Sequence, residues 1–72
     1  MPKLPRISGA ECVRALERLG FVRVRQRGSH VVMRRDDRGC VVPMHHELKA
    51  GTLHGVLKQA GVDPDDFLKS LA

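Results

Sequence analysis

The chain has 72 residues and a formal net charge of +5 at pH 7, which allows one domain and disfavours a large cofactor in a deep pocket. It has no Trp, no Tyr and two Phe, which disfavours a single-strand binder that stacks bases on aromatic rings. Residues 1–35 hold nine basic side chains against two acidic ones, whereas residues 36–72 hold four against six. Most of the first nine are arginines, so we expect a nucleic-acid partner, with a solvated arginine-rich surface as the alternative.

The first predicted element is an amphipathic helix that begins after Ser8. Ser8 and Glu11 have the spacing of a capping box, in which each side chain satisfies a backbone N–H of the other residue. Apolar residues then recur at helical spacing, namely Cys12, Val13, Leu16 and Leu19. Gly20 suits the left-handed position that ends a helix.

Residues 21–44 predict three antiparallel strands joined by two short turns. Residues 21–27 alternate with period two, residues 30–35 form a second apolar run, and residues 40–44 form a third. Gly28-Ser29 predicts the first turn, and the polar residues 36–39, which end in a glycine, predict the second. Pro43 donates no backbone hydrogen bond, so we expect it at a sheet edge or at a strand end.

Two helices are predicted after the strands. Thr52 is the expected cap of the first, whose apolar residues are Leu53, Val56, Leu57 and Ala60, and Gly61 is expected to end it. Asp63 and Pro64 predict the start of a short last helix. The predicted fold is a single α+β domain over residues 1–72, with α-β-β-β-α order and a short helix added. Its helices cover one face of the three-stranded sheet, and the other face stays open.

Strand periodicity predicts which residues lie on that open face. If Val22 and Val24 face the helices, then Arg23, Arg25 and Arg27 lie on the open side. With Val31 and Met33 in the core, the open side of the second strand carries His30, Val32 and Arg34.

An imidazole at His30 among arginines has a chemical consequence. Positive charge nearby favours the neutral imidazole, which can accept a proton near pH 7. RNA provides its own nucleophile, the 2′-hydroxyl, and arginines can stabilise charge that develops on the adjacent phosphate. The alternative is that His30 is a hydrogen-bonding surface residue, that the arginines are the solvated side of a strand, and that Ser29 is only a turn residue.

No metal site or cofactor is expected. Cys12 and Cys40 fit neither a metal-binding spacing nor a disulfide framework. His45 and His46 are adjacent, so in an extended chain they point to opposite sides and rarely bind one ion together. We find no apolar run of the length of a signal peptide or a membrane span, and we expect a soluble protein of the reducing cytoplasm.

The ordered motifs resemble the HicA family of bacterial toxins, which are the RNA-cleaving half of HicA–HicB toxin–antitoxin pairs. The resemblance covers about residues 8–67 and no single motif is specific. It rests on Ser8-Gly9 at the helix start, Leu19-Gly20-Phe21, the run from Arg25 to His30, Val42-Pro43-Met44-His45, and the two segments Leu48–Leu53 and Leu57–Gly61.

The resemblance implies a fold like that of double-stranded-RNA-binding domains and a type II toxin that inhibits translation and growth in a stress response. It implies a ribosome-independent mRNA endonuclease in which His30, the His after Gly-Ser, is catalytic, with His45 as a candidate helper. It also implies a HicB-type antitoxin that blocks the active face. The predicted RNA-binding residues are Arg23, Arg25, Arg27, Ser29 and Arg34, and Gly28 forms the turn that presents the site at His30. The alternative is that the chain is a non-catalytic module that binds structured RNA.

Overall fold

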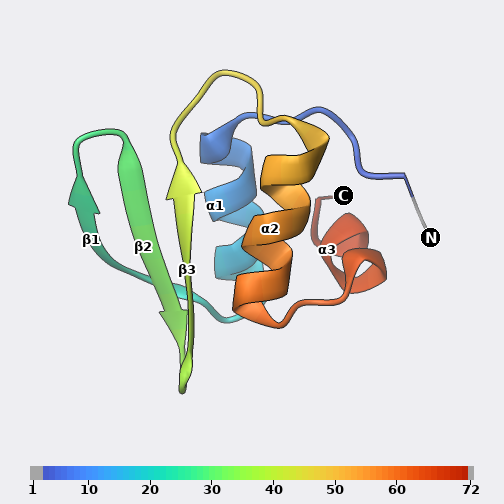
Figure 1. The fold of residues 1–72 in the computed structure, drawn as a ribbon. Coiled ribbons are helices and arrows are strands. Elements are labelled where there is room, and N and C mark those ends of the chain that lie inside the picture. Colours follow the sequence, from blue (N-terminus) through green and yellow to red (C-terminus); the bar gives the residue numbers. More distant parts are fainter. Residues whose placement is uncertain (1–2, 72) are drawn as a thin grey trace.

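The computed structural model describes residues 3–71, and it confirms the predicted α+β fold. Met1, Pro2 and Ala72, which the domain prediction includes, lie outside the described residues. The elements in chain order are α1 (Gly9–Arg18), β1 (Val22–Arg27), β2 (His30–Arg35), β3 (Arg38–Pro43), α2 (Ala50–Ala60) and α3 (Pro64–Ser70). The strands form an antiparallel sheet in the order β1-β2-β3, and the helices pack to one side of it (Figure 1). None of the helices within residues 3–71 is both long and apolar enough to cross a membrane.

Helix α1 begins with the predicted capping box. The Glu11 N–H donates to the Ser8 hydroxyl and the Ser8 N–H donates to the Glu11 carboxylate, each at 3.0 Å. Hydrogen bonding to the Glu11 carboxylate, first from the Ser8 backbone N–H and then from the Ser8 side chain, lowers the pKa of this carboxyl because it favours the charged form. Gly20 follows the helix with φ +97, as expected for a glycine that ends a helix.

The core lies between the helices and one face of β2 and β3. Val31 and Met33 are fully buried, which confirms the predicted orientation of β2. Val42 and Cys40 continue this face on β3, and Phe67 of α3 is also buried. No polar or charged side chain is buried among the described residues, so the core is held by apolar packing.

Two element boundaries differ from the sequence prediction by two residues or more. Helix α2 begins at Ala50, and its N-cap residue is Lys49, three residues before the predicted cap at Thr52. Lys49 provides no side-chain hydrogen bond. Strand β3 begins at Arg38, so the second turn contains only two residues. Asp36 occupies the left-handed region there, with φ +53, which aspartate tolerates better than most residues, and Gly39 lies inside the strand.

The predicted orientation of β1 is correct for Arg25 and Arg27 and wrong for the start of the strand, from Val22 to Val24. Val22 and Val24 are 61% and 53% exposed and do not face the core. The pairing register shifts between Arg23 and Arg25, so Val24 is an extra residue in a β-bulge that reverses the alternation. Arg23 pairs with the buried Met33 and therefore faces the helix side, contrary to the prediction.

Candidate functional site

The pairing register defines the open face of the sheet as three rows of residues. His30 lies between Arg27 of β1 and Pro43 of β3, and directly opposed residues point to the same side of a sheet. The second row is Arg25, Val32 and Val41, and the third is Val22, Arg34 and Gly39. We call these nine residues the open face. His30, Arg25, Arg27 and Arg34 are all exposed to solvent.

The electrostatic character of the open face is positive. It carries three arginines and no acidic side chain. The structure therefore brings together His30 and three of the four predicted arginines, and it separates Arg23 from them. Arg34 is partly held by its own turn, because its Nε donates to the Asp36 carbonyl at 3.2 Å. Directly opposed residues are about 5 Å apart at Cβ, so Arg27 and His30 can contact the same ligand.

The turn before His30 is fixed by two hydrogen bonds. Gly28 has φ +56, a conformation that favours glycine, and the Gln26 Nε2 donates to its carbonyl oxygen at 3.0 Å. The Ser29 carbonyl accepts from the Met44 N–H at 2.6 Å, which extends the β2–β3 pairing by one residue. The Ser29 side chain is exposed, and the turn presents it beside His30.

His45 lies at the same end of the sheet as this turn. It follows Met44 directly, its side chain is exposed, and its carbonyl oxygen accepts from the Gly9 N–H at 2.9 Å. A Cβ atom at Gly9 would overlap the Pro43 carbonyl oxygen and would lie 2.7 Å from the Met44 Cα. The start of α1, the end of β3 and the β1–β2 turn therefore meet at one end of the molecule (Figure 1).

Two features of this region were not predicted from the sequence. The first is the extent of the apolar component of the open face. Val32 was predicted there, but Val41 joins it through the β2–β3 pairing and Val22 joins it because of the bulge in β1. The second is the role of Arg35, which lies over the Phe21 ring at 4.7 Å and donates to the Leu19 carbonyl at 2.6 Å. These contacts make Arg35 a structural residue that ties β2 to the end of α1.

The cysteines do not contribute to the site. Burial raises the pKa of Cys12 to about 12 and that of Cys40 to about 11, so both thiols stay protonated at neutral pH. Within residues 3–71, no three His, Cys, Asp or Glu side chains form a group that could hold a metal ion.

A comparison of the sequence with protein-family models identifies the family of this chain. The family model described as the HicA toxin of bacterial toxin–antitoxin systems matches residues 9–62, from the first residue of α1 to the residue after Gly61. The matched segment includes the whole open face. A search among curated proteins found no match to the chain. The chain belongs to the HicA toxin family, and it is the toxin of a toxin–antitoxin system.

Proposed function

We propose that this toxin is a ribosome-independent endoribonuclease that cleaves mRNA in the cytoplasm and uses His30 as its general acid or base. The observation that supports this most strongly is the row formed by Arg27, His30 and Pro43 on the open face. It pairs a titratable imidazole with a permanent positive charge on a surface that an extended RNA chain can reach. A face of this kind suits a small domain, because the nucleophile comes from the RNA itself.

The proposed reaction is transfer of the phosphoryl group to the 2′-oxygen. Neutral His30 accepts the proton of the 2′-hydroxyl, and the 2′-oxygen bonds to the adjacent phosphorus. The bond from phosphorus to the 5′-oxygen breaks, and that oxygen takes a proton from a second group, for which His45 is the candidate. Arg25 and Arg27 stabilise the charge on the phosphate oxygens. The products are a 2′,3′-cyclic phosphate and a 5′-hydroxyl.

The purified chain is expected to cleave a long mRNA in the presence of excess EDTA. The reaction above uses only side chains and the substrate, so it needs no metal ion and no cofactor. Mass spectrometry of the fragments should show 2′,3′-cyclic phosphate ends, and DNA of the same sequence should stay intact because it has no 2′-hydroxyl. Activity that is lost in EDTA and restored by a divalent metal would contradict the proposed mechanism.

The partner that we propose for the open face is a HicB-type antitoxin. Val22 and Val41 are 61% and 39% exposed on this face, and RNA phosphates gain nothing from them. A protein that covers the face would bury these valines together with Val32 and would exclude RNA from His30. The apolar component therefore supports inhibition by direct covering of the site.

The alternative function is a module that binds structured RNA without cutting it, and the same arginines would serve it. Replacing Arg25 and Arg27 together with Ala is expected to weaken RNA binding, because each arginine neutralises phosphate charge on the open face. The slope of log K against log salt should fall by about 1.4 for single-stranded RNA if each arginine contacts one phosphate. Fluorescence anisotropy across a salt series measures this slope.

The control is Arg23→Ala, which removes one positive charge from the helix side of β1 and is compared with Arg25→Ala and Arg27→Ala made singly. It should leave the salt slope close to the wild-type value. If Arg23→Ala lowers the salt slope as much as Arg25→Ala or Arg27→Ala does, the RNA follows the β1 edge and not the open face.

A further inference from the structure

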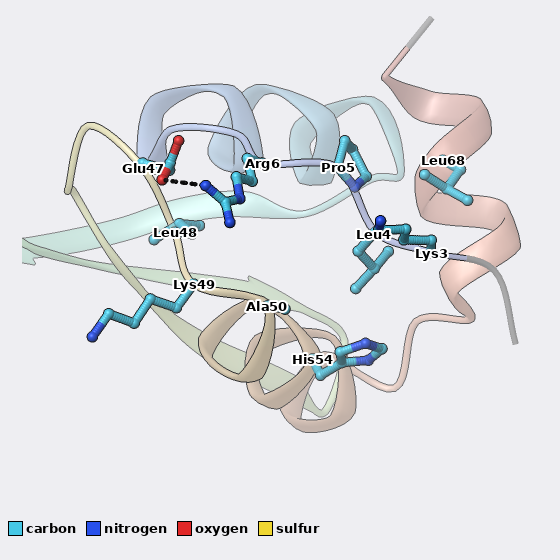
Figure 2. Close-up of a pocket in the computed structure, with 10 residues that line it drawn as sticks. All are labelled: Lys3, Leu4, Pro5, Arg6, Glu47, Leu48, Lys49, Ala50, His54 and Leu68. Carbon is cyan, nitrogen blue, oxygen red and sulfur yellow. Dashed lines mark ion pairs between the residues drawn. The ribbon is translucent and has the colours of Figure 1, made fainter.

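A groove of about 880 Å³ lies in the helical layer, and none of its lining residues belongs to the open face. Figure 2 shows it between the N-terminal segment, residues 3–6, and the start of α2, with Leu68 of α3 beside the N-terminal segment. The N-terminal segment is held in place by Leu4 and Ile7, which are buried, and by the Leu48 N–H, which donates to the Ile7 carbonyl at 2.7 Å. The groove is therefore a fixed feature of the fold.

The groove combines an apolar lining with a positive rim. The accessible apolar surface comes from Pro5, Ala50 and Leu68, because Leu4 and Leu48, which also line the groove, are only 7% and 1% exposed. The cationic side chains at the rim are those of Lys3, Arg6 and Lys49, and His54 lies beside Leu4 (Figure 2).

The positive rim lacks a matching set of negative charges. Glu47 is the acidic residue that lines the groove, and it lies 3.7 Å from Arg6 in an ion pair whose side chains are 82% and 61% exposed. An exposed pair of this kind is weak and can exchange partners. Helix α2, which begins at this rim, has no acidic residue in its first turn and no side-chain cap, which adds to the positive potential.

We propose that this groove docks an acidic, amphipathic segment of the antitoxin. The apolar lining favours a protein over RNA, because a peptide can place an aliphatic side chain on Leu68 and Pro5 while its carboxylates face the cationic side chains of the rim. An RNA strand offers phosphates to the rim but nothing to the aliphatic surface, and the groove has no aromatic side chain for a base. The proposal rests on the family's toxin–antitoxin partnership and not on the proposed nuclease activity.

The test is the affinity of the full chain for its purified antitoxin, measured by isothermal titration calorimetry. Ala50 is exposed, lines the groove and is the first residue of α2, so Ala50→Glu places a negative charge at the rim. The substitution should not lower the melting temperature, because an acidic residue suits the first turn of a helix. We expect it to weaken antitoxin binding about tenfold and to leave RNA binding unchanged. Lys49→Glu should have an effect in the same direction.

The control for a change of charge alone is Lys69→Glu, on the exposed surface of α3 outside the groove, which should bind the antitoxin within twofold of wild type. Wild-type affinity in Ala50→Glu would overturn the proposal, and so would a wild-type chain that does not bind the antitoxin. A loss of RNA binding without a loss of antitoxin binding would assign the groove to RNA instead. The affinity for the antitoxin does not depend on nuclease activity. The groove proposal and the nuclease proposal can therefore fail independently of each other.

Discussion

Replacing His30 with Ala is expected to abolish RNA cleavage and growth arrest while the fold stays intact. Removal of a general base lowers the rate by about 10²–10⁴-fold, and the open face contains no other titratable group that could replace it. His30 is exposed, so the free energy of unfolding should change by no more than about 0.5 kcal/mol. Cleavage of purified RNA, growth after induction, and thermal unfolding followed by circular dichroism measure the three effects.

The matched control is His46→Ala, an exposed histidine in the connection between β3 and α2 that no pairing places on the open face. It should retain cleavage and growth arrest. His45→Ala should lower the cleavage rate less than His30→Ala if it protonates the 5′-oxygen, since water can partly replace a proton donor. Full toxicity of His30→Ala would refute the catalytic role of His30 and would favour the RNA-binding alternative.

Local signals in the sequence were sufficient to predict most of the fold correctly. The capping box of Ser8 and Glu11 and the glycines after the helices mark boundaries by backbone chemistry that acts over three or four residues. The orientation of β2 was also correct, because Val31 and Met33 alternate into the core. The start of α2 was missed because Lys49 provides no side-chain cap, so nothing in the local sequence marks that position.

The orientation of β1 could not be derived from its own residues. Its alternation of valine and arginine predicts buried valines, but β1 is an edge strand and all six of its residues are exposed. Because none of these side chains is buried, the apolar pattern does not set the pairing register of β1. The bulge at Val24 reverses the alternation of the residues before it. Arg25 and Arg27 lie on the open face because the hairpin pairs them with Val32 and His30, whereas the bulge moves Arg23 to the helix side.

The neighbourhood of His30 depends on both local and distant contacts. A two-residue turn at Gly28-Ser29 pairs Arg27 with His30, so this part of the site follows from the hairpin. The position of His45 depends on the contact between the start of α1 and the end of β3, which are separated by more than thirty residues. The only local signal for that contact is a glycine in the first turn of a helix, where it has no role in capping.

Replacing Gly9 with Ala is expected to destabilise the protein, although the same change normally stabilises a helix by about 1 kcal/mol. The added Cβ would overlap the Pro43 carbonyl oxygen, which is backbone and cannot rotate away. Overpacking of this kind costs about 1–3 kcal/mol. An overlap with backbone belongs at the upper end of this range and leaves a net loss of about 2 kcal/mol after the gain in helix propensity. For a domain of this size, each kcal/mol shifts the melting temperature by about 4–8 °C, so calorimetry should show a fall of several degrees.

The matched control for Gly9→Ala is Gly55→Ala, because Gly55 lies inside α2 with no neighbouring atom within 4 Å of an added Cβ. It should raise the melting temperature, since only the helix propensity changes. Equal stabilisation in both variants would mean that α1 does not pack against the end of β3. If α1 is displaced in Gly9→Ala, the hydrogen bond from the Gly9 N–H to the His45 carbonyl is lost as well. The cleavage rate should then be lower than that of the wild type even at temperatures below the melting transition. This result would show that the placement of His45 depends on the packing of α1.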